Sequence, residues 1–280
     1  MTRALITGCT SGIGLEFAWQ LAGIGHDLVL TARNGDRVRA IAAQIESLHS
    51  VKTEVITADL SIRDELEQVS RRLTDPVAPV DLLVNNAGYG LHTSFLDTDV
   101  QQHEVHLDTQ VRAILVLCHT AAGSMVKRRR GAIINVSSLA GYTASGTFAA
   151  AKSWVTAFTE SLAEELQDSG VTATAVLPGF VETEPHERAA MNAKGLPRVT
   201  WLTAPFVVQQ ALRDAARGQV LSIPTLKQKA ASERTRRVVP RGVLTRLLGS
   251  RWSTRINERQ VEKARRTTAL KDLTIPWASS

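Results

Sequence analysis

The 280-residue sequence has only two cysteines, Cys9 and Cys118, and no apolar run as long as the roughly 18 residues that a membrane helix needs. Two cysteines cannot form a disulfide framework, and such a low number is typical of proteins in a reducing compartment. We expect no signal peptide, because residues 4–7 already have the pattern of a strand. With 44% apolar and 21% charged residues, the chain is expected to be a soluble, globular, cytoplasmic protein.

Several motifs that would indicate other chemistry are missing. There is no G-x-S-x-G turn of the hydrolases and no P-loop of nucleoside triphosphatases. His103 and His106 have the spacing of two metal ligands on a helix, but no suitable third ligand lies nearby in the sequence. We therefore expect no metal site.

Positive charge is concentrated near the C-terminus. Residues 227–266 contain thirteen Lys or Arg against three acids, a net +10, so the rest of the chain carries −4 of the total +6. We interpret this stretch as the solvated face of a helix and expect no nucleic-acid partner. Peripheral contact of the basic tail with an anionic membrane stays open as an alternative.

Short apolar runs alternate with helical patterns along residues 1–225. The predicted strands are residues 4–7, 27–32, 53–58, 81–85, 132–136, 172–177 and 220–223. The predicted helices are residues 14–22, 37–48, 63–73, 100–126, 147–168 and 205–217. This alternation predicts an α/β fold, a Rossmann-type doubly wound parallel sheet of about seven strands with helices on both faces. Residues 226–280 are expected to form a basic helical extension packed on that domain.

A glycine-rich turn follows the first predicted strand. Gly8, Gly12 and Gly14 allow a tight turn, a close approach to a pyrophosphate and close packing of a helix on the sheet. The helix that begins here offers free N–H groups to phosphates. The sequence therefore predicts a dinucleotide site at this turn, to which Thr10, Ser11 and Ile13 also belong.

The spacing T-G-x-x-x-G-x-G resembles that of the short-chain dehydrogenase/reductase family. Four more segments agree with that resemblance: Asn85–Gly88 after the fourth predicted strand, Asn135–Ser138 after the fifth, Lys152 in the next helix, and Pro178-Gly179 with Thr183 after the sixth. The similarity covers roughly residues 1–225 and implies an oxidoreductase that uses a nicotinamide cofactor. The resemblance implies these further cofactor contacts: Asp59, Leu60, Asn86, Ala87, Gly88, Lys152, Pro178, Gly179, Val181 and Thr183.

Arg33 indicates which nicotinamide cofactor is used. NAD-binding proteins place an acid at the end of the second strand, where it accepts hydrogen bonds from the ribose hydroxyls. This sequence has Arg33 there, and a guanidinium can bind a 2′-phosphate with two parallel hydrogen bonds. We therefore expect NADP(H) as the cofactor.

The family resemblance implies a catalytic asparagine, serine, tyrosine and lysine, and this chain departs from that set. Ser138 and Lys152 fit the serine and the lysine, but Phe148 stands at the tyrosine position and Gln110 at the asparagine position. The interval from Ser138 to Phe148 is also about three residues shorter than is usual in the family. Tyr142 and His186 are the alternative proton donors, provided that the fold brings either of them close.

Three functions remain open. The first is NADP(H)-dependent hydride transfer to or from a small carbonyl, alcohol or imine, with the general acid replaced by Phe148. The second is a non-redox enzyme such as a cyclase or dehydratase, and the third is an inactive cofactor-binding regulator. The family resemblance further implies a small-molecule substrate recognised by residues 184–200, and a homodimer or homotetramer that packs through the two long helices.

Overall fold

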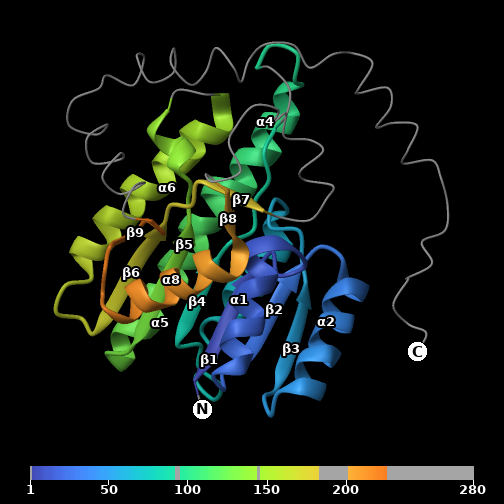
Figure 1. Ribbon diagram of the computed structural model, residues 1–280, viewed down its shortest axis with the longest axis vertical. Helices are drawn as coiled ribbons and strands as arrows, with labels where there is room; N and C mark the ends of the chain where they lie inside the picture. The colour runs from blue at the N-terminus through green and yellow to red at the C-terminus, as the bar shows by residue number, and fades with distance from the viewer. Residues whose placement is uncertain (1, 92–94, 144–145, 183–200, 226–280) are drawn as a thin grey trace.

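A seven-stranded parallel sheet forms the centre of the protein (Figure 1). The computed structural model describes residues 2–91, 95–143, 146–182 and 201–225. The sheet has the order β3-β2-β1-β4-β5-β6-β9. Its members are β1 (Arg3–Thr7), β2 (Asp27–Ala32), β3 (Thr53–Thr57), β4 (Leu82–Asn85), β5 (Gly131–Val136), β6 (Val171–Val176) and β9 (Leu221–Ser222). The predicted Rossmann-type α/β fold is confirmed.

Helices connect the strands, and their ends lie close to those predicted from the apolar periodicity. They are α1 (Gly12–Gly23), α2 (Gly35–Leu48), α3 (Arg63–Arg72), α4 (Val100–Leu107), α5 (Ala113–Arg128), α6 (Gly146–Glu165) and α8 (Ala204–Ala216). One prediction was wrong, because the helix expected over residues 100–126 is interrupted. A π-helical turn, η1 (Asp108–Arg112), lies between α4 and α5. Turns of this kind occur mostly as single insertions in α-helices, often at functional sites.

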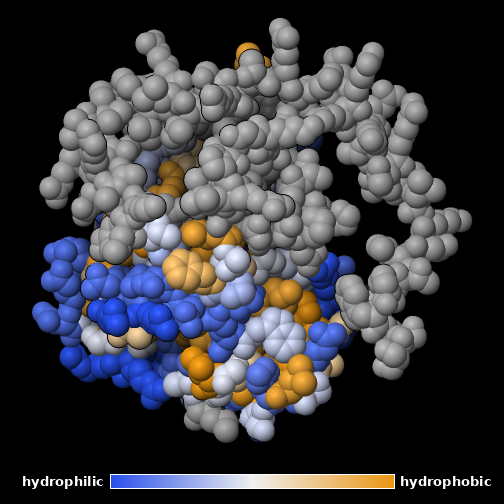
Figure 2. Space-filling model, viewed as in Figure 1, coloured by the Kyte–Doolittle hydropathy of each residue, from blue (hydrophilic) through white to orange (hydrophobic). Residues whose placement is uncertain are grey.

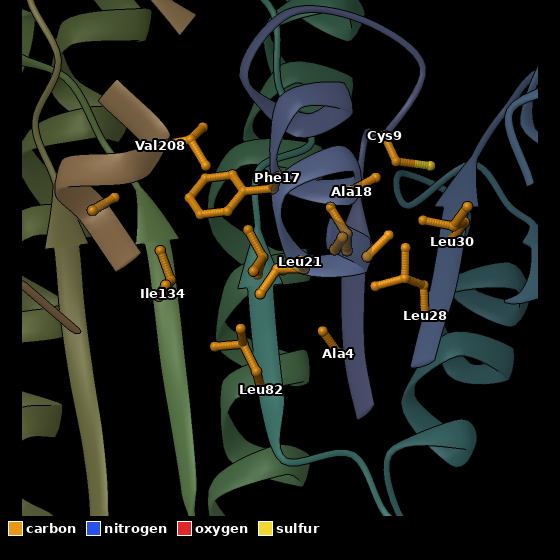
Figure 3. Close-up of a cluster of buried hydrophobic side chains, with 14 of the residues drawn as sticks. Ala4, Cys9, Phe17, Ala18, Leu21, Leu28, Leu30, Leu82, Ile134 and Val208 are labelled. Atoms are coloured by element: carbon orange, nitrogen blue, oxygen red, sulfur yellow. The ribbon is translucent and has the colours of Figure 1, made fainter. Parts of the chain in front are cut away.

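The sheet has an apolar core on each face. Helices α1, α2 and α8 cover one face, where Phe17 of α1 packs with Val208 of α8 over the strands (Figure 3). Helices α3, α5 and α6 supply the core on the other face. Because both faces are covered, the central strands β1, β2 and β4 are buried along most of their length, whereas the edge strand β3 has exposed residues at Glu54 and Thr57. On the outer surface, Figure 2 shows polar side chains with small apolar groups between them.

The strand order places a topological switch point, where this fold class has its ligand crevice, at the carboxyl ends of β1 and β4. Chain connections lead from this pair toward opposite ends of the sheet, so the turns that follow the two strands diverge there. Ligands of open α/β sheets bind at such a switch point. The Gly8–Gly14 turn after β1 and the residues after β4 lie at this edge.

Three short elements were not predicted. β7 (Phe180–Glu182) and β8 (Trp201–Thr203) form a separate parallel pair, and η2 (Leu139–Tyr142) is a single 3-10 turn. Three residues are too few to show a periodicity in the sequence. Asn85 and Asn135 lie inside β4 and β5, within the strands predicted over residues 81–85 and 132–136.

Some expectations fall on residues that the structure does not describe. The extension over residues 226–280, the segment 184–200, Thr183 and His186 all lie outside the described residues. Within the described ones, no helix is both long and apolar enough to cross a membrane.

Candidate functional site

The turn after β1 has the shape that its glycines predicted. Gly8 and Gly12 have φ angles of +69° and +53°, which are strained for residues with a Cβ. A Cβ on Gly14 would collide with the Asn86 side chain and with the Gly8 carbonyl. Glycine is therefore needed at 8 and 12 for backbone shape and at 14 for the close packing of α1.

The N-terminus of α1 is open toward the crevice. Ser11 is its N-cap in an extended conformation, and the Ser11 side chain makes no capping hydrogen bond. The first turn of α1 contains no acid. Its N–H groups and the positive end of the helix dipole are thus available to an anion, so this turn fits a pyrophosphate.

Asn86 joins the turn after β4 to the turn after β1. Its Nδ2 donates to the carbonyls of Thr7 and Gly8 at 3.1 and 3.0 Å. The Thr7 hydroxyl oxygen accepts the backbone N–H groups of Asn86 and Ala87, each at 3.0 Å. These four bonds fix Ala87 and Gly88 beside the glycine turn, where a dinucleotide would cross the sheet edge.

Arg33 lies directly after β2, and its side chain is 71% exposed. Its Nη1 is 3.9 Å from a carboxylate oxygen of Asp59, which follows β3. A pair so long and so open to solvent contributes little stability, so the guanidinium is free to turn toward a phosphate. Leu60 next to Asp59 is buried and forms part of the core on one sheet face.

The other predicted cofactor residues lie along the same edge. Thr10 is in the turn, Ile13 is in the first turn of α1, and Pro178 and Gly179 follow β6. Val181 lies in β7 and is buried.

Lys152 is buried on α6, and its Nζ donates to the Val136 carbonyl at the end of β5, at 2.8 Å. Burial lowers the pKa of Lys152 to about 8. Phe148 lies one helical turn earlier, with the Lys152 Nζ 5.7 Å from its ring centroid. The Phe148 ring therefore lies beside the lysine and carries no hydroxyl.

Ser138 is the N-cap of η2, and its Oγ accepts the N–H of Ala140 at 3.1 Å. With an acceptor position already used, its hydroxyl hydrogen is left to donate. The neighbouring Ser137 has a different task, because its Oγ bonds to the Lys152 carbonyl at 2.8 Å and to Thr156 Oγ1 at 2.7 Å. Ser137 thereby ties β5 to α6.

Gln110 lies in η1 and is fully buried. Its Nε2 donates to the Tyr89 carbonyl at 2.6 Å and lies 3.1 Å from the Nε2 of His106. His106 Nε2 is itself 3.1 Å from the same carbonyl. The Gln110 side chain thus binds the turn after β4.

The sequence pattern marked His106 only as one of two histidines spaced like metal ligands, and it did not indicate Tyr89. The spacing of four residues between His106 and Gln110 puts both side chains on one helix face, and this signal was available in the sequence. His103 bonds instead to Thr147 Oγ1 at 3.2 Å and to the Phe95 carbonyl at 3.3 Å. Tyr142, proposed as a stand-in acid, lies half-buried in η2.

Comparison with known proteins identifies the family. A family model described as short chain dehydrogenase matches residues 2–194. A 3-oxoacyl-(acyl-carrier-protein) reductase of Aquifex aeolicus is 32% identical over 184 residues, 65% of this chain and 74% of that protein. Sulfoacetaldehyde reductase 2 of Chromohalobacter salexigens is 35% identical over 187 residues, 64% of this chain and 73% of its own.

Solved structures of proteins described as dehydrogenases are also similar to this chain. A short-chain dehydrogenase from Sphingobium yanoikuyae in complex with NADPH aligns with a TM-score of 0.78 at 29% identity, covering 92% of this chain and 100% of that one. A bulky-bulky ketone specific alcohol dehydrogenase from Comamonas testosteroni aligns with a TM-score of 0.74 at 26% identity, over 92% of this chain and 98% of that one. The chain belongs to the short-chain dehydrogenase family, whose members are oxidoreductases that bind nicotinamide cofactors.

Proposed function

We propose that this protein is an NADP(H)-dependent oxidoreductase that transfers hydride to or from a small carbonyl, alcohol or imine. The observation that carries the proposal is the presence of an open glycine turn at α1 together with a buried lysine of α6 whose Nζ bonds to the end of β5. The relatives named above as reductases of an oxoacyl group and of an aldehyde support a carbonyl substrate.

Each part of the crevice has a role in this proposal. NADPH, when bound, supplies the hydride. The α1 N-terminus holds the pyrophosphate, Arg33 the 2′-phosphate, and the Asn86–Gly88 turn the ribose. Lys152 donates hydrogen bonds to the nicotinamide ribose. Pro178, Gly179, Val181 and Thr183 are proposed to border the nicotinamide.

The proposed site differs from the set that the family resemblance implies in that it lacks the tyrosine that would donate a proton. Phe148 fills the volume of a tyrosine but has no proton to give, and a positioned general acid accelerates such a step by about 10²- to 10⁴-fold. Ser138 can donate a hydrogen bond to a substrate oxygen, which stabilises negative charge without transferring a proton. An iminium substrate requires no such proton, because reduction of its carbon leaves a neutral amine.

A second candidate is a non-redox enzyme or a regulator that binds the cofactor without oxidising it. Phe148 and Gln110 favour it, since both replace groups that the family resemblance assigns to catalysis. Both candidates predict cofactor binding, and only the first predicts cofactor oxidation. An assay of NADPH oxidation over a panel of ketones, aldehydes and imines therefore separates them.

The cofactor assignment is tested by titrating NADPH and NADH by fluorescence. We expect NADPH to bind at least about tenfold more tightly, a difference of roughly 1.4 kcal/mol. Arg33→Ala should weaken NADPH and leave NADH nearly unchanged. Arg71→Ala is the matched control. The Arg71 side chain has a similar exposed fraction, 67%, and lies in the last turn of α3, outside the proposed cofactor site. Equal affinities of the unaltered protein for both cofactors would contradict NADP(H) specificity.

A further inference from the structure

Two buried side chains converge on one backbone carbonyl beside the cofactor crevice. Tyr89 O lies 2.6 Å from Gln110 Nε2 and 3.1 Å from His106 Nε2. The two donors come from consecutive helical turns, His106 from α4 and Gln110 from η1. Tyr89 directly follows Gly88, so this carbonyl belongs to the turn that is proposed to carry the ribose.

Packing of His106 and Gln110 also holds the turn around this carbonyl. The Tyr89 ring meets the His106 ring edge-on, with centroids 5.4 Å apart and planes at 88°. A Cβ on Gly88 would lie 2.7 Å from Gln110 Oε1, so the amide rests against the main chain of the turn. The His106 ring centroid is also 6.3 Å from that of Phe148. His106 thus contacts both the turn and the aromatic residue of the site.

We propose that His106 is a positioning residue for the cofactor: together with Gln110, it fixes the Tyr89 carbonyl and thereby the Gly88 main chain against which the dinucleotide binds. This inference rests on the proposed nicotinamide site. His106 contacts neither cofactor nor substrate in this scheme and acts only through the turn.

The surroundings of the second ring nitrogen favour a neutral imidazole. With the hydrogen on Nε2, His106 donates to Tyr89 O, while Nδ1 is buried without a hydrogen-bond partner among the described residues. Protonation would place a second N–H on Nδ1, where it has no acceptor. Unsatisfied buried donors cost about 1–3 kcal/mol.

The charged and titratable groups around His106 act in the same direction. Burial is the main cause that lowers the pKa of His106, and the Lys152 ammonium from α6 and His103 on α4 lower it further, against the Tyr89 carbonyl, which raises it. The ring is therefore neutral at pH 7. Below its pKa the ring keeps the Nε2–H but gains a buried N–H on Nδ1, for which the described residues offer no acceptor, and rotation of the ring to relieve that cost would take one of the two donors from the carbonyl.

The test uses two substitutions that differ by one methylene. In His106→Gln the side-chain amide nitrogen can reach the position of Nε2 and donate to the Tyr89 carbonyl. In His106→Asn it reaches only the position of Nδ1, so the Tyr89 carbonyl loses this donor. Both variants and the unaltered protein are titrated with NADH and NADPH between pH 5.5 and 8. NADH is the decisive ligand, because the 2′-phosphate of NADPH ionises near pH 6.

We expect His106→Asn to weaken NADH about fivefold at pH 7.5, the effect of one lost hydrogen bond, and His106→Gln to stay within about twofold. The unaltered protein should lose affinity as the pH falls below 6.5, and His106→Gln should not. Thermal melting of each variant at pH 7.5 checks that it is folded. If His106→Asn does not fold, the pH profiles of the other two proteins still decide the question.

Equal affinities of all three proteins, with the same pH profile, would overturn the role of His106 and leave the proposed cofactor site intact. Equal weakening of both variants with an unchanged pH profile would mark His106 as a packing residue only, and would also overturn the inference. If the unaltered protein binds neither dinucleotide, the proposed function fails and this inference fails with it.

Discussion

The Lys152 ammonium lies 5.7 Å from the ring centroid of Phe148, four residues earlier on α6. Residues at this spacing are neighbours on a helix surface, so the ring stands beside the cation. A cation near an aromatic face is attracted to it, but the ring cannot exchange protons with it. A hydroxyl on this ring would meet a group whose positive charge lowers the pKa of a phenol.

Phe148→Tyr should therefore raise turnover of a carbonyl substrate by about 10²-fold or more, because it returns a general acid beside an intact Lys152. The measurement is NADPH oxidation over ketones, aldehydes and imines. Activity that appears only in the variant would mark a disabled reductase. Imine reduction by the unaltered protein would mark an enzyme that has no need of the acid. Absence of oxidation in both, with tight NADPH binding, would remove the redox proposal.

Adding Gln110→Asn to Phe148→Tyr restores the residue that the family resemblance implies, yet we expect it to weaken cofactor binding. Asparagine is one methylene shorter, and the 2.6 Å bond from Gln110 to the Tyr89 carbonyl would be lost. The KM for NADPH should rise several-fold at an unchanged or modestly raised kcat. A double variant with a lower KM than Phe148→Tyr alone would show that the Gln110 contact is dispensable.

Lys152→Met should stabilise the protein while weakening its cofactor affinity. Burial lowers the pKa of Lys152 from 10.5 to about 8, so keeping the ammonium charged at neutral pH costs the folded state roughly 3 kcal/mol. Loss of its bond to the Val136 carbonyl offsets about 1 kcal/mol of the gain. We expect a net rise in the free energy of unfolding of about 2 kcal/mol at pH 7, measured by urea denaturation.

The free energies of unfolding of Lys152→Met and of the unaltered protein should also differ in their pH dependence, and the sign of that effect is fixed by the lowered pKa of Lys152. Between pH 8 and 10.5 the unfolded chain keeps the Lys152 proton and the folded protein has lost it, so the unaltered protein gains stability relative to the variant as the pH rises. Comparing the two proteins cancels the other titrating groups, including Cys9 and Cys118. A difference that stays constant across this range would contradict a lowered pKa of Lys152.

Gly14→Ala should destabilise the protein by about 1–3 kcal/mol and weaken NADPH, because its Cβ would push α1 away from Asn86 and the Gly8 carbonyl. Gly123→Ala is the matched control. Gly123 lies inside α5, and a Cβ added there would meet no atom within 4 Å, so alanine should add about 0.5–1 kcal/mol of stability. Thermal melting and NADPH titration of both variants give the comparison. Equal stability changes would refute the packing role of Gly14.

Deletion of residues 241–280 should leave NADPH affinity unchanged, since every cofactor motif lies between residues 7 and 183. Flotation with anionic liposomes at low and physiological salt tests the alternative role of the basic tail. Salt-sensitive binding by the full chain that is lost on deletion would replace the solvated-helix interpretation by a membrane contact.

The sequence predicted the sheet and the glycine turn because their signals are local. Apolar runs mark the strands, and Gly8, Gly12 and Gly14 stand at fixed spacing after the first of them. The contact among Tyr89, His106 and Gln110 is different, since it depends on a π-helical turn and on a backbone carbonyl 17 residues before His106. Neither a backbone acceptor nor a π-turn leaves a residue pattern, so the sequence could name Gln110 but not its partner.

The β7–β8 pair has a consequence for how this chain could change its substrate. Phe180 pairs with Trp201 and Glu182 with Thr203, so the chain leaves and re-enters the fold at adjacent points. These two points are held together by the pairing of β7 with β8, which is separate from the pairing within the seven-stranded sheet. We therefore expect that replacing residues 184–200 with the corresponding stretch of a relative transfers substrate preference and leaves the melting temperature and the cofactor affinity, which involves Thr183, unchanged.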